Sequence, residues 1–195
     1  MTKASPERYN SVAIILHWTI ALLVIGQLAG GLIMTKLPKD LLELKFQMIQ
    51  LHKSFGITIL LLTFIRLGWR LAHKAPPFPA VMSKWEKLAA RSVHVLFYVL
   101  LIVTPLLGWA VVSSSPLAKT VHTYLFGVVY WPHMPFFDGV ADRKALSHEI
   151  AEFHEKAAFI MIGLIVLHVS AALKHHFFNH DRVLSNMLPF VRSRA

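Results

Sequence analysis

The sequence of 195 residues contains no cysteine. Disulfide bonds, iron–sulfur clusters, thiolate zinc sites and covalently attached haem, which needs a Cys-x-x-Cys-His motif, are therefore excluded. Any metal or redox centre must be held by other side chains. Histidine is abundant for so apolar a chain, with 12 residues, and several of them fall inside long apolar stretches.

Charged residues are also scarce in this sequence. Charged residues make up 15% of the sequence and apolar residues 55%, and the mean hydropathy is +0.55. A water-soluble domain needs far more charge to cover its surface, so the composition indicates a protein that lies in a lipid bilayer. The formal net charge of +10 could indicate nucleic acid. Most of the excess lies between and after the apolar stretches, where it indicates topology, so we expect no nucleic-acid partner.

Two familiar enzyme motifs are also missing. No Gly-rich phosphate loop occurs, and no soluble domain is present to bind a nucleotide. The His-Glu pairs that begin at His148 and His154 do not form the His-Glu-x-x-His pattern of zinc proteases, because the fifth positions are Glu152 and Ala158.

Four apolar stretches are present, at about 12–34, 49–71, 92–113 and 151–173. Each is long enough to cross about 30 Å of hydrocarbon. The second contains Lys53, Arg66 and Arg70, whose long side chains can reach the interface from its ends. The first is longer than the core of a typical secretion signal, so we expect it to be retained. The sequence therefore predicts an all-α membrane protein, a single domain over 1–195 built as a bundle of four transmembrane helices.

Basic residues are unevenly distributed between the two sides of this predicted bundle. Twelve of the 20 lie on one side, and the other eight share their side with seven of the ten acids. Because basic residues accumulate on the cytoplasmic side, both termini are predicted to be cytoplasmic. The twelve are Lys3, Arg8, Arg66, Arg70, Lys74, Lys84, Lys87, Arg91, Lys174, Arg182, Arg192 and Arg194.

Five histidines lie within the predicted helices, where an ionisable residue usually has a function. Because successive helices run in opposite directions, His17, His94 and His168 fall near the inner side, and His52 and His154 near the outer side. The fourteen residues between His154 and His168 correspond to a rise of about 21 Å and a return to nearly the same helix face. Two imidazoles on one helix face, separated by this rise, suit two cofactors at different depths.

Matching these depths pairs His17 with His168 and His52 with His154. A single metal ion needs ligands within about 2 Å, which residues so far apart on one helix cannot offer. Two b-type haems in the bundle core satisfy the pattern, and a haem iron held by two histidines passes electrons because it has no open position. A lone intramembrane histidine more often bonds to another helix. A non-haem transporter that uses histidines for metal or protons is the alternative.

Several short motifs accompany these histidines. They are Pro6-Glu7-Arg8-Tyr9, Leu16-His17-Trp18, Leu51-His52-Lys53-Ser54-Phe55-Gly56, Pro105-Leu106-Leu107-Gly108, His154-Glu155 and Ala171-Ala172-Leu173-Lys174-His175-His176-Phe177, which continues to Met187-Leu188-Pro189. With Arg66, Arg70, His94 and His168, these motifs resemble the bacterial cytochrome b561 family over nearly the whole chain. The run that begins at Ala171 is the most specific.

The resemblance implies a four-helix protein of the bacterial inner membrane that holds two haem b groups and exchanges electrons with ubiquinone. One branch of the family oxidises superoxide at the outer face, and this chain is similar to that branch in size and tail. An alternative is a haem-bearing anchor subunit of a dehydrogenase or hydrogenase complex, for which a redox partner protein is expected.

Further residues are candidates for the inner site. His94 could line a quinone pocket, replace one of the assigned ligands or bond to another helix. His175 lies seven residues beyond His168 on the same face, where it could bind a quinone carbonyl or be exposed at the surface. Arg66 and Arg70 could neutralise haem propionates or anchor the helix at the interface.

At the outer side, Lys53 follows His52 directly and Lys156 is two residues beyond His154. Cations beside an outer haem would attract a small anion such as superoxide, or would pair with a haem propionate. The long outer connection, residues 114–148, is rich in aromatic residues and is predicted to lie over the outer face as a short amphipathic segment.

Overall fold

The computed structural model describes residues 8–188. Four long helices make up most of it: α1 (Ser11–Lys36), α2 (Leu42–Ala72), α3 (Lys84–Ser114) and α4 (Arg143–Phe177). A short 3-10 turn, η1 (Lys39–Leu41), leads into α2. Several residues of the motifs and of the charge count lie outside the described part of the chain, namely Lys3, Pro6, Glu7, Pro189, Arg192 and Arg194.

The helices extend beyond the apolar stretches that predicted them. α3 begins at Lys84 because Ser83 and Glu86 form a reciprocal capping box at its N-terminus. α4 begins at Arg143, where the side chain of Asp142 accepts a hydrogen bond from the backbone N–H of Ala145. Polar caps therefore start both helices well before their apolar residues begin.

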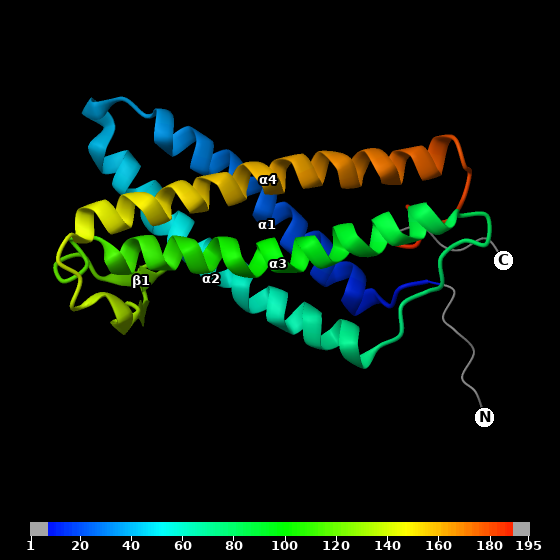
Figure 1. The fold of residues 1–195 in the computed structure, drawn as a ribbon, viewed down its shortest axis with the longest axis horizontal. Helices are drawn as coiled ribbons and strands as arrows, with labels where there is room; N and C mark the ends of the chain where they lie inside the picture. Colours follow the sequence, from blue (N-terminus) through cyan, green and yellow to red (C-terminus); the bar gives the residue numbers. More distant parts are fainter. Residues whose placement is uncertain (1–7, 189–195) are drawn as a thin grey trace.

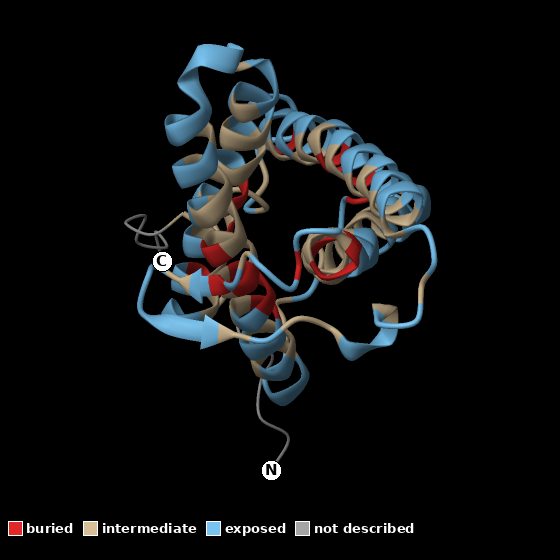
Figure 2. Ribbon diagram, turned by 90° about the vertical axis from the view of Figure 1, so that its left-hand side faces the viewer, coloured by how far each residue is buried: buried red, intermediate tan, exposed pale blue. Residues whose placement is uncertain are grey.

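All four helices are long and apolar enough to cross a membrane. Their outward faces carry many large apolar side chains that no other part of the described chain covers, including Ile15, Leu22, Phe64, Val95 and Val166. Figure 2 shows these exposed faces turned outward and the buried residues turned toward the centre of the bundle. The predicted all-α bundle of four membrane-spanning helices is confirmed.

Close backbone packing joins α1 to α2, α2 to α3 and α3 to α4. The connection between α2 and α3 and both described ends of the chain lie at one end of the bundle, and the hairpin labelled β1 lies at the other (Figure 1). Four crossings bring the chain back to the side from which it started. We call the end that holds the described chain ends the terminal end, and the end that holds β1 the hairpin end.

The buried core receives residues from every helix. It consists of Ile20 and Val24 of α1, Ile59 of α2, Leu100 and Leu101 of α3, and Ala157, Met161 and Leu164 of α4. On α4 these residues fall between His154 and His168. An aliphatic layer therefore separates the two histidine levels of the bundle.

The connection between α3 and α4 differs from the predicted amphipathic segment. It contains an antiparallel hairpin, β1 (Thr123–Leu125) and β2 (Val129–Trp131), and a short turn, η2 (Pro135–Phe137). The turn places Phe126 and Gly127 at positive φ, of 51° and 75°. Phe126 is held there by its backbone N–H, which donates to the buried hydroxyl of Ser54 at 2.9 Å, and by its ring, 5.1 Å from that of Phe55. The hairpin is thus attached to α2 beside His52.

Candidate functional site

The inner pair of imidazoles comes from two helices that make few close backbone contacts. His17 of α1 and His168 of α4 face each other with ring centroids 6.3 Å apart. Both side chains are partly buried. The structure therefore brings together the two histidines that their depths in the sequence paired.

The outer pair has nearly the same geometry. His52 of α2 and His154 of α4 have ring centroids 6.1 Å apart. Nδ1 of His154 lies 2.9 Å from the carbonyl oxygen of Thr104, which leaves Nε2 of that ring toward the centre of the pair. Nδ1 of His52 is buried and has no hydrogen-bond partner among the described residues. Gln27 donates to the carbonyl oxygen of His52 at 2.7 Å and fixes the backbone there.

These separations fit a metal ion held between two imidazoles. A bond of about 2 Å to a nitrogen of each ring places the two ring centroids roughly 6 Å apart. The inner and outer pairs have separations of 6.3 and 6.1 Å. No cluster of three or more His, Cys, Asp or Glu residues able to bind a metal ion occurs within residues 8–188. The donor sets therefore suit two flat macrocycles with axial imidazoles better than a metal site built by the protein alone.

Gly108 and Gly31 leave room for the outer rings. A Cβ atom at Gly108 would lie 3.1 Å from Cε1 of His154, which is closer than ordinary contact. At Gly31 a Cβ atom would lie 3.5 Å from Cε1 of His52, an ordinary van der Waals distance. An added side chain is therefore tolerated less well at Gly108 than at Gly31.

His94 lies at the inner level as a third imidazole. Its ring centroid is 5.7 Å from that of His168, and its Nδ1 lies 2.7 Å from the carbonyl oxygen of Ala90 in the preceding turn. Phe97, which lies on α3 with His94, also packs against His168, with ring centroids 5.3 Å apart. His94 is thus close to the inner pair, but one of its nitrogens is bonded to its own helix.

His175 is buried rather than exposed, with 6% of its surface accessible. Its Nδ1 lies 2.5 Å from a carboxylate oxygen of Asp181, and the amide of Asn179 is 3.1 Å from the same nitrogen. The other carboxylate oxygen of Asp181 accepts from the backbone N–H of Val183. This contact turns the chain back at the end of α4. Of the two alternatives for His175, exposure at the surface does not hold, because Asp181 covers the ring.

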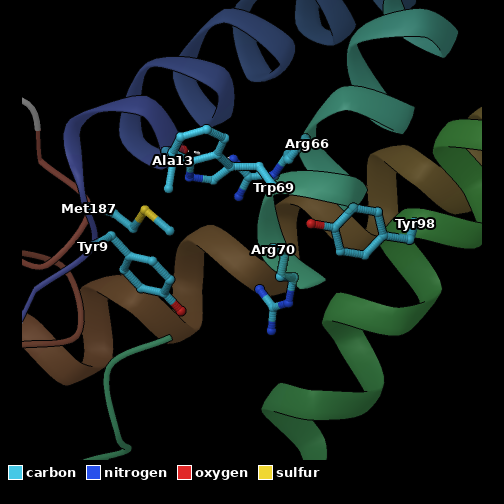
Figure 3. Close-up of a pocket in the computed structure, with 7 residues that line it drawn as sticks. All are labelled: Tyr9, Ala13, Arg66, Trp69, Arg70, Tyr98 and Met187. Carbon is cyan, nitrogen blue, oxygen red and sulfur yellow. Dashed lines mark hydrogen bonds between the residues drawn. The ribbon is translucent and has the colours of Figure 1, made fainter. Parts of the chain in front are cut away.

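The returning segment reaches α1 at the terminal end. Trp18 donates its indole N–H to the carbonyl oxygen of Met187 at 2.7 Å, and Arg8 donates to that of Leu188. A small pocket lies beside this contact (Figure 3). Its lining residues are Tyr9, Ala13, Arg66, Trp69, Arg70, Tyr98 and Met187.

Arg66 and Arg70 both line this pocket and are only partly exposed. Arg66 donates to the carbonyl oxygen of Ala13 at 2.9 Å, one helical turn before His17. Both arginines therefore lie between the inner imidazole pair and the terminal end. This is where the acidic edge of an inner haem would need cations.

The two lysines at the hairpin end differ in their surroundings. Lys53 is partly buried and donates to the hydroxyl of Thr123 at 3.1 Å. Lys156 is exposed and forms an ion pair with Glu152 at 3.3 Å, one turn earlier in α4. The charge of Lys156 is therefore largely compensated, and Lys53 is the stronger candidate to attract an anion.

Sequence reasoning missed Tyr98, Thr104 and Gly108 as neighbours of the candidate sites. Tyr98 stands in an apolar stretch with no recognisable motif around it, and Thr104 precedes the Pro105–Gly108 motif without being part of it. Gly108 belongs to the Pro105–Gly108 motif, but only the packing of α3 against α4 reveals that its missing side chain accommodates His154.

The sequence matches known proteins over a range that includes all four histidines of the two imidazole pairs. A family model described as "Prokaryotic cytochrome b561" matches residues 8–190. The chain is 34% identical over 186 residues to "Cytochrome b561 homolog 2" of Escherichia coli (strain K12), covering 94% of this chain and 93% of that protein. "Cytochrome b561 homolog 1" of the same strain is 30% identical over 183 residues, with coverages of 94% and 98%. "Probable superoxide oxidase CybB" of Yersinia pestis is 29% identical over 190 residues, with coverages of 94% and 97%.

Proposed function

Because the chain belongs to the prokaryotic cytochrome b561 family, and is therefore a membrane protein that binds b-type haem, we propose that it carries electrons between two haem sites. The inner site is formed by His17 and His168 and the outer site by His52 and His154. The observation that carries this proposal is the pair of imidazole separations, 6.3 and 6.1 Å, at two levels of one bundle. Haem supplies one-electron redox chemistry when bound.

The remaining residues position and balance such groups. Thr104 orients His154 through its carbonyl oxygen, which leaves the other ring nitrogen available for an iron. Arg66 and Arg70 would neutralise the propionates of the inner haem. The core aliphatic layer keeps water from the space between the two levels. Two histidines for each haem would leave no open position for oxygen, which favours electron transfer.

The proposed route runs from a donor at the outer side to ubiquinone near the inner side. We place the chain in the bacterial inner membrane with both termini in the cytoplasm, which the distribution of basic residues supports. The terminal end of the bundle is then the inner side and the hairpin end the outer side. His94 and His175 are the proposed contacts for a quinone at the inner side, since one lies against His168 and the other lies in the last turn of α4.

Superoxide is the proposed donor at the hairpin end. One relative is described as a probable superoxide oxidase, and Lys53 offers a partly buried cation directly beside His52. A fixed cation raises the local concentration of a small anion and its rate of encounter. Stopped-flow mixing of superoxide with the purified protein and a quinone acceptor tests this part. Decay no faster than spontaneous dismutation would remove superoxide from the proposal.

Haem stoichiometry tests the two-site proposal itself. The purified wild-type chain is expected to carry two haems, and the His17→Ala and His52→Ala variants one each. His148→Ala is the matched control, because His148 is an exposed histidine of α4 whose Nδ1 lies 3.6 Å from a carboxylate oxygen of Glu152; it should retain both haems. Fewer than two haems in the fully loaded wild type, or two in either variant, contradicts the assignment.

A further inference from the structure

The inner pocket contains two positively charged side chains from α2. Arg66 and Arg70 line it, and neither forms an ion pair with any acidic side chain in residues 8–188. Arg66 donates one N–H group to the carbonyl oxygen of Ala13 and lies beside the hydroxyl of Tyr98, and its remaining N–H groups can bind an anion. Uncompensated cations within a membrane-spanning helix are costly. An anion bound in the pocket would neutralise them.

Tyr98 contributes a buried hydroxyl group beside Arg66. Its oxygen lies close enough to the guanidinium group of Arg66 to interact with it, but it forms no hydrogen bond of normal geometry with any described residue, and its O–H group is left to donate. In Figure 3 this oxygen points from α3 into the space beside Arg66 and Arg70. A buried hydroxyl normally has a partner, because leaving it unpaired forfeits the hydrogen bond that water would make. Two guanidinium groups and a phenol thus line the same small pocket, where all three can donate hydrogen bonds to a carboxylate.

The pocket lies next to the inner imidazole pair. Ala13 lines it and stands four residues before His17, a rise of about 6 Å along α1. Tyr98 stands four residues after His94 on α3, and the ring of His94 is 5.7 Å from that of His168. Residues on both sides of the pocket are therefore one turn from the inner imidazoles, within reach of the carboxylate-bearing edge of a haem.

We propose that Tyr98 is a positioning residue that donates a hydrogen bond to a propionate of the inner haem and completes a carboxylate site with Arg66 and Arg70. This inference rests on the proposed function, since it requires a haem between His17 and His168. The guanidinium groups match the planar carboxylate and supply charge. The phenol adds a short charge-assisted bond from a third direction, which fixes the rotation of the macrocycle about the axis through the two imidazoles.

Infrared difference spectroscopy of the intact holoprotein tests the contact. Cells fed 5-aminolevulinate labelled with ¹³C at its carboxyl group make haem with labelled propionates. The reduced-minus-oxidised spectrum is recorded at the potential of the inner haem, identified as the redox component missing from His17→Ala. Tyr98→Phe should keep two haems per chain, move the labelled carboxylate band, and shift the reduction equilibrium of the inner haem by roughly threefold.

Tyr124→Phe is the matched control, because Tyr124 is an exposed tyrosine of the hairpin, at the opposite end of the bundle. It should leave the labelled band and the equilibrium unchanged. The wild type provides a second measurement should Tyr98→Phe fail to accumulate. With ring-deuterated tyrosine incorporated, a tyrosine band should appear in the difference spectrum of the inner haem.

Two results overturn the assignment of Tyr98. One is a labelled carboxylate band that is identical in Tyr98→Phe and wild type, or the lack of any tyrosine band in the second measurement. The other is a shift confined to the carbonyl bands of bound ubiquinone, which would make the pocket a quinone site. Failure of the two-haem proposal is read separately, from the haem count of the wild type and His17→Ala.

Discussion

The imidazole of His154 lies against the backbone of Gly108, where an added Cβ atom would come within 3.1 Å of Cε1. The same ring has its Nδ1 2.9 Å from the carbonyl oxygen of Thr104, one turn earlier on α3. α3 thus holds His154 from two sides. The outer imidazole pair depends on this contact between α3 and α4 as much as on the two histidines themselves.

Gly108→Ala should therefore damage the outer haem site alone. The new methyl group displaces the ring of His154 from His52, and changes of this kind beside a metal ligand typically weaken metal binding by about tenfold or more. Haem content is expected to fall toward one per chain, measured by the pyridine haemochrome spectrum. Gly163→Ala is the control, because a Cβ atom there meets nothing within 4 Å. Equal haem contents in the two variants would contradict this account of the contact.

His94→Ala should retain both haems. The inner pair already supplies two axial imidazoles, and His94 bonds to the carbonyl oxygen of Ala90 in its own helix. If His94 faces a quinone, loss of its ring should slow quinone reduction by about tenfold, as expected for one lost hydrogen bond. Haem content and quinone-reduction kinetics are measured on the same preparation. A loss of one haem would show that His94, and not His17, is the ligand opposite His168.

Lys53→Gln should slow the reaction with superoxide at the outer side. Removal of one partly buried cation beside His52 is expected to lower the second-order rate constant by about three- to tenfold at low ionic strength. The difference should shrink as salt is added, because salt screens the attraction. Lys156→Gln is the comparison and should have a smaller effect, since Glu152 already pairs with Lys156. Rates that are independent of salt in the wild type would exclude steering by charge.

Attachment of the hairpin should depend on pH through His133. The pKa of His133 is lowered from 6.5 because its ring is partly buried; the nearby side chains of Lys53, His122 and Arg143 lower it further, and a hydrogen bond to the backbone of Ala118 acts in the opposite direction. The detached segment binds a proton more readily than the attached one, so attachment is strongest above pH 6.5 and weakens as the pH falls below that value.

Hydrogen exchange of residues 122–134 measures this attachment. Exchange should be slow at about pH 7.5 and, after correction for the intrinsic rate, faster at about pH 5.5. His133→Gln should remove the pH-dependent part, and the exposed His148→Gln should not change it. A wild-type segment with equal protection at both pH values would refute the role of His133.

The bundle and the pairing of its histidines could be predicted because both follow from spacing along single helices. Four apolar stretches of sufficient length indicate four crossings, and alternation of direction assigns His17 and His168 to one depth. The fourteen residues between His154 and His168 place two imidazoles on one face of α4. These inferences need only the rise and twist of an α-helix.

The surroundings of the histidines could not be predicted, because they depend on contacts between distant segments. The strands β1 and β2 have three residues each, too few for an alternating pattern to indicate them. The cover over His175 comes from Asp181 after the end of α4, and the role of Gly108 depends on α4. Tyr98 resembles any other aromatic residue of a membrane helix until Arg66 and Arg70 are placed beside it.

The aliphatic layer between the two histidine levels has a consequence for charge movement. Side chains such as Val24, Leu101 and Met161 offer no chain of hydrogen bonds, and the nearby hydroxyl of Thr63 is bonded to the carbonyl oxygen of Ile59 in its own helix. An electron can tunnel through such a barrier, whereas a proton cannot hop across it. In the proposed route, a reaction that consumes protons at one face would draw them from the water on that face, so electron transfer between the two levels would move net charge across the lipid.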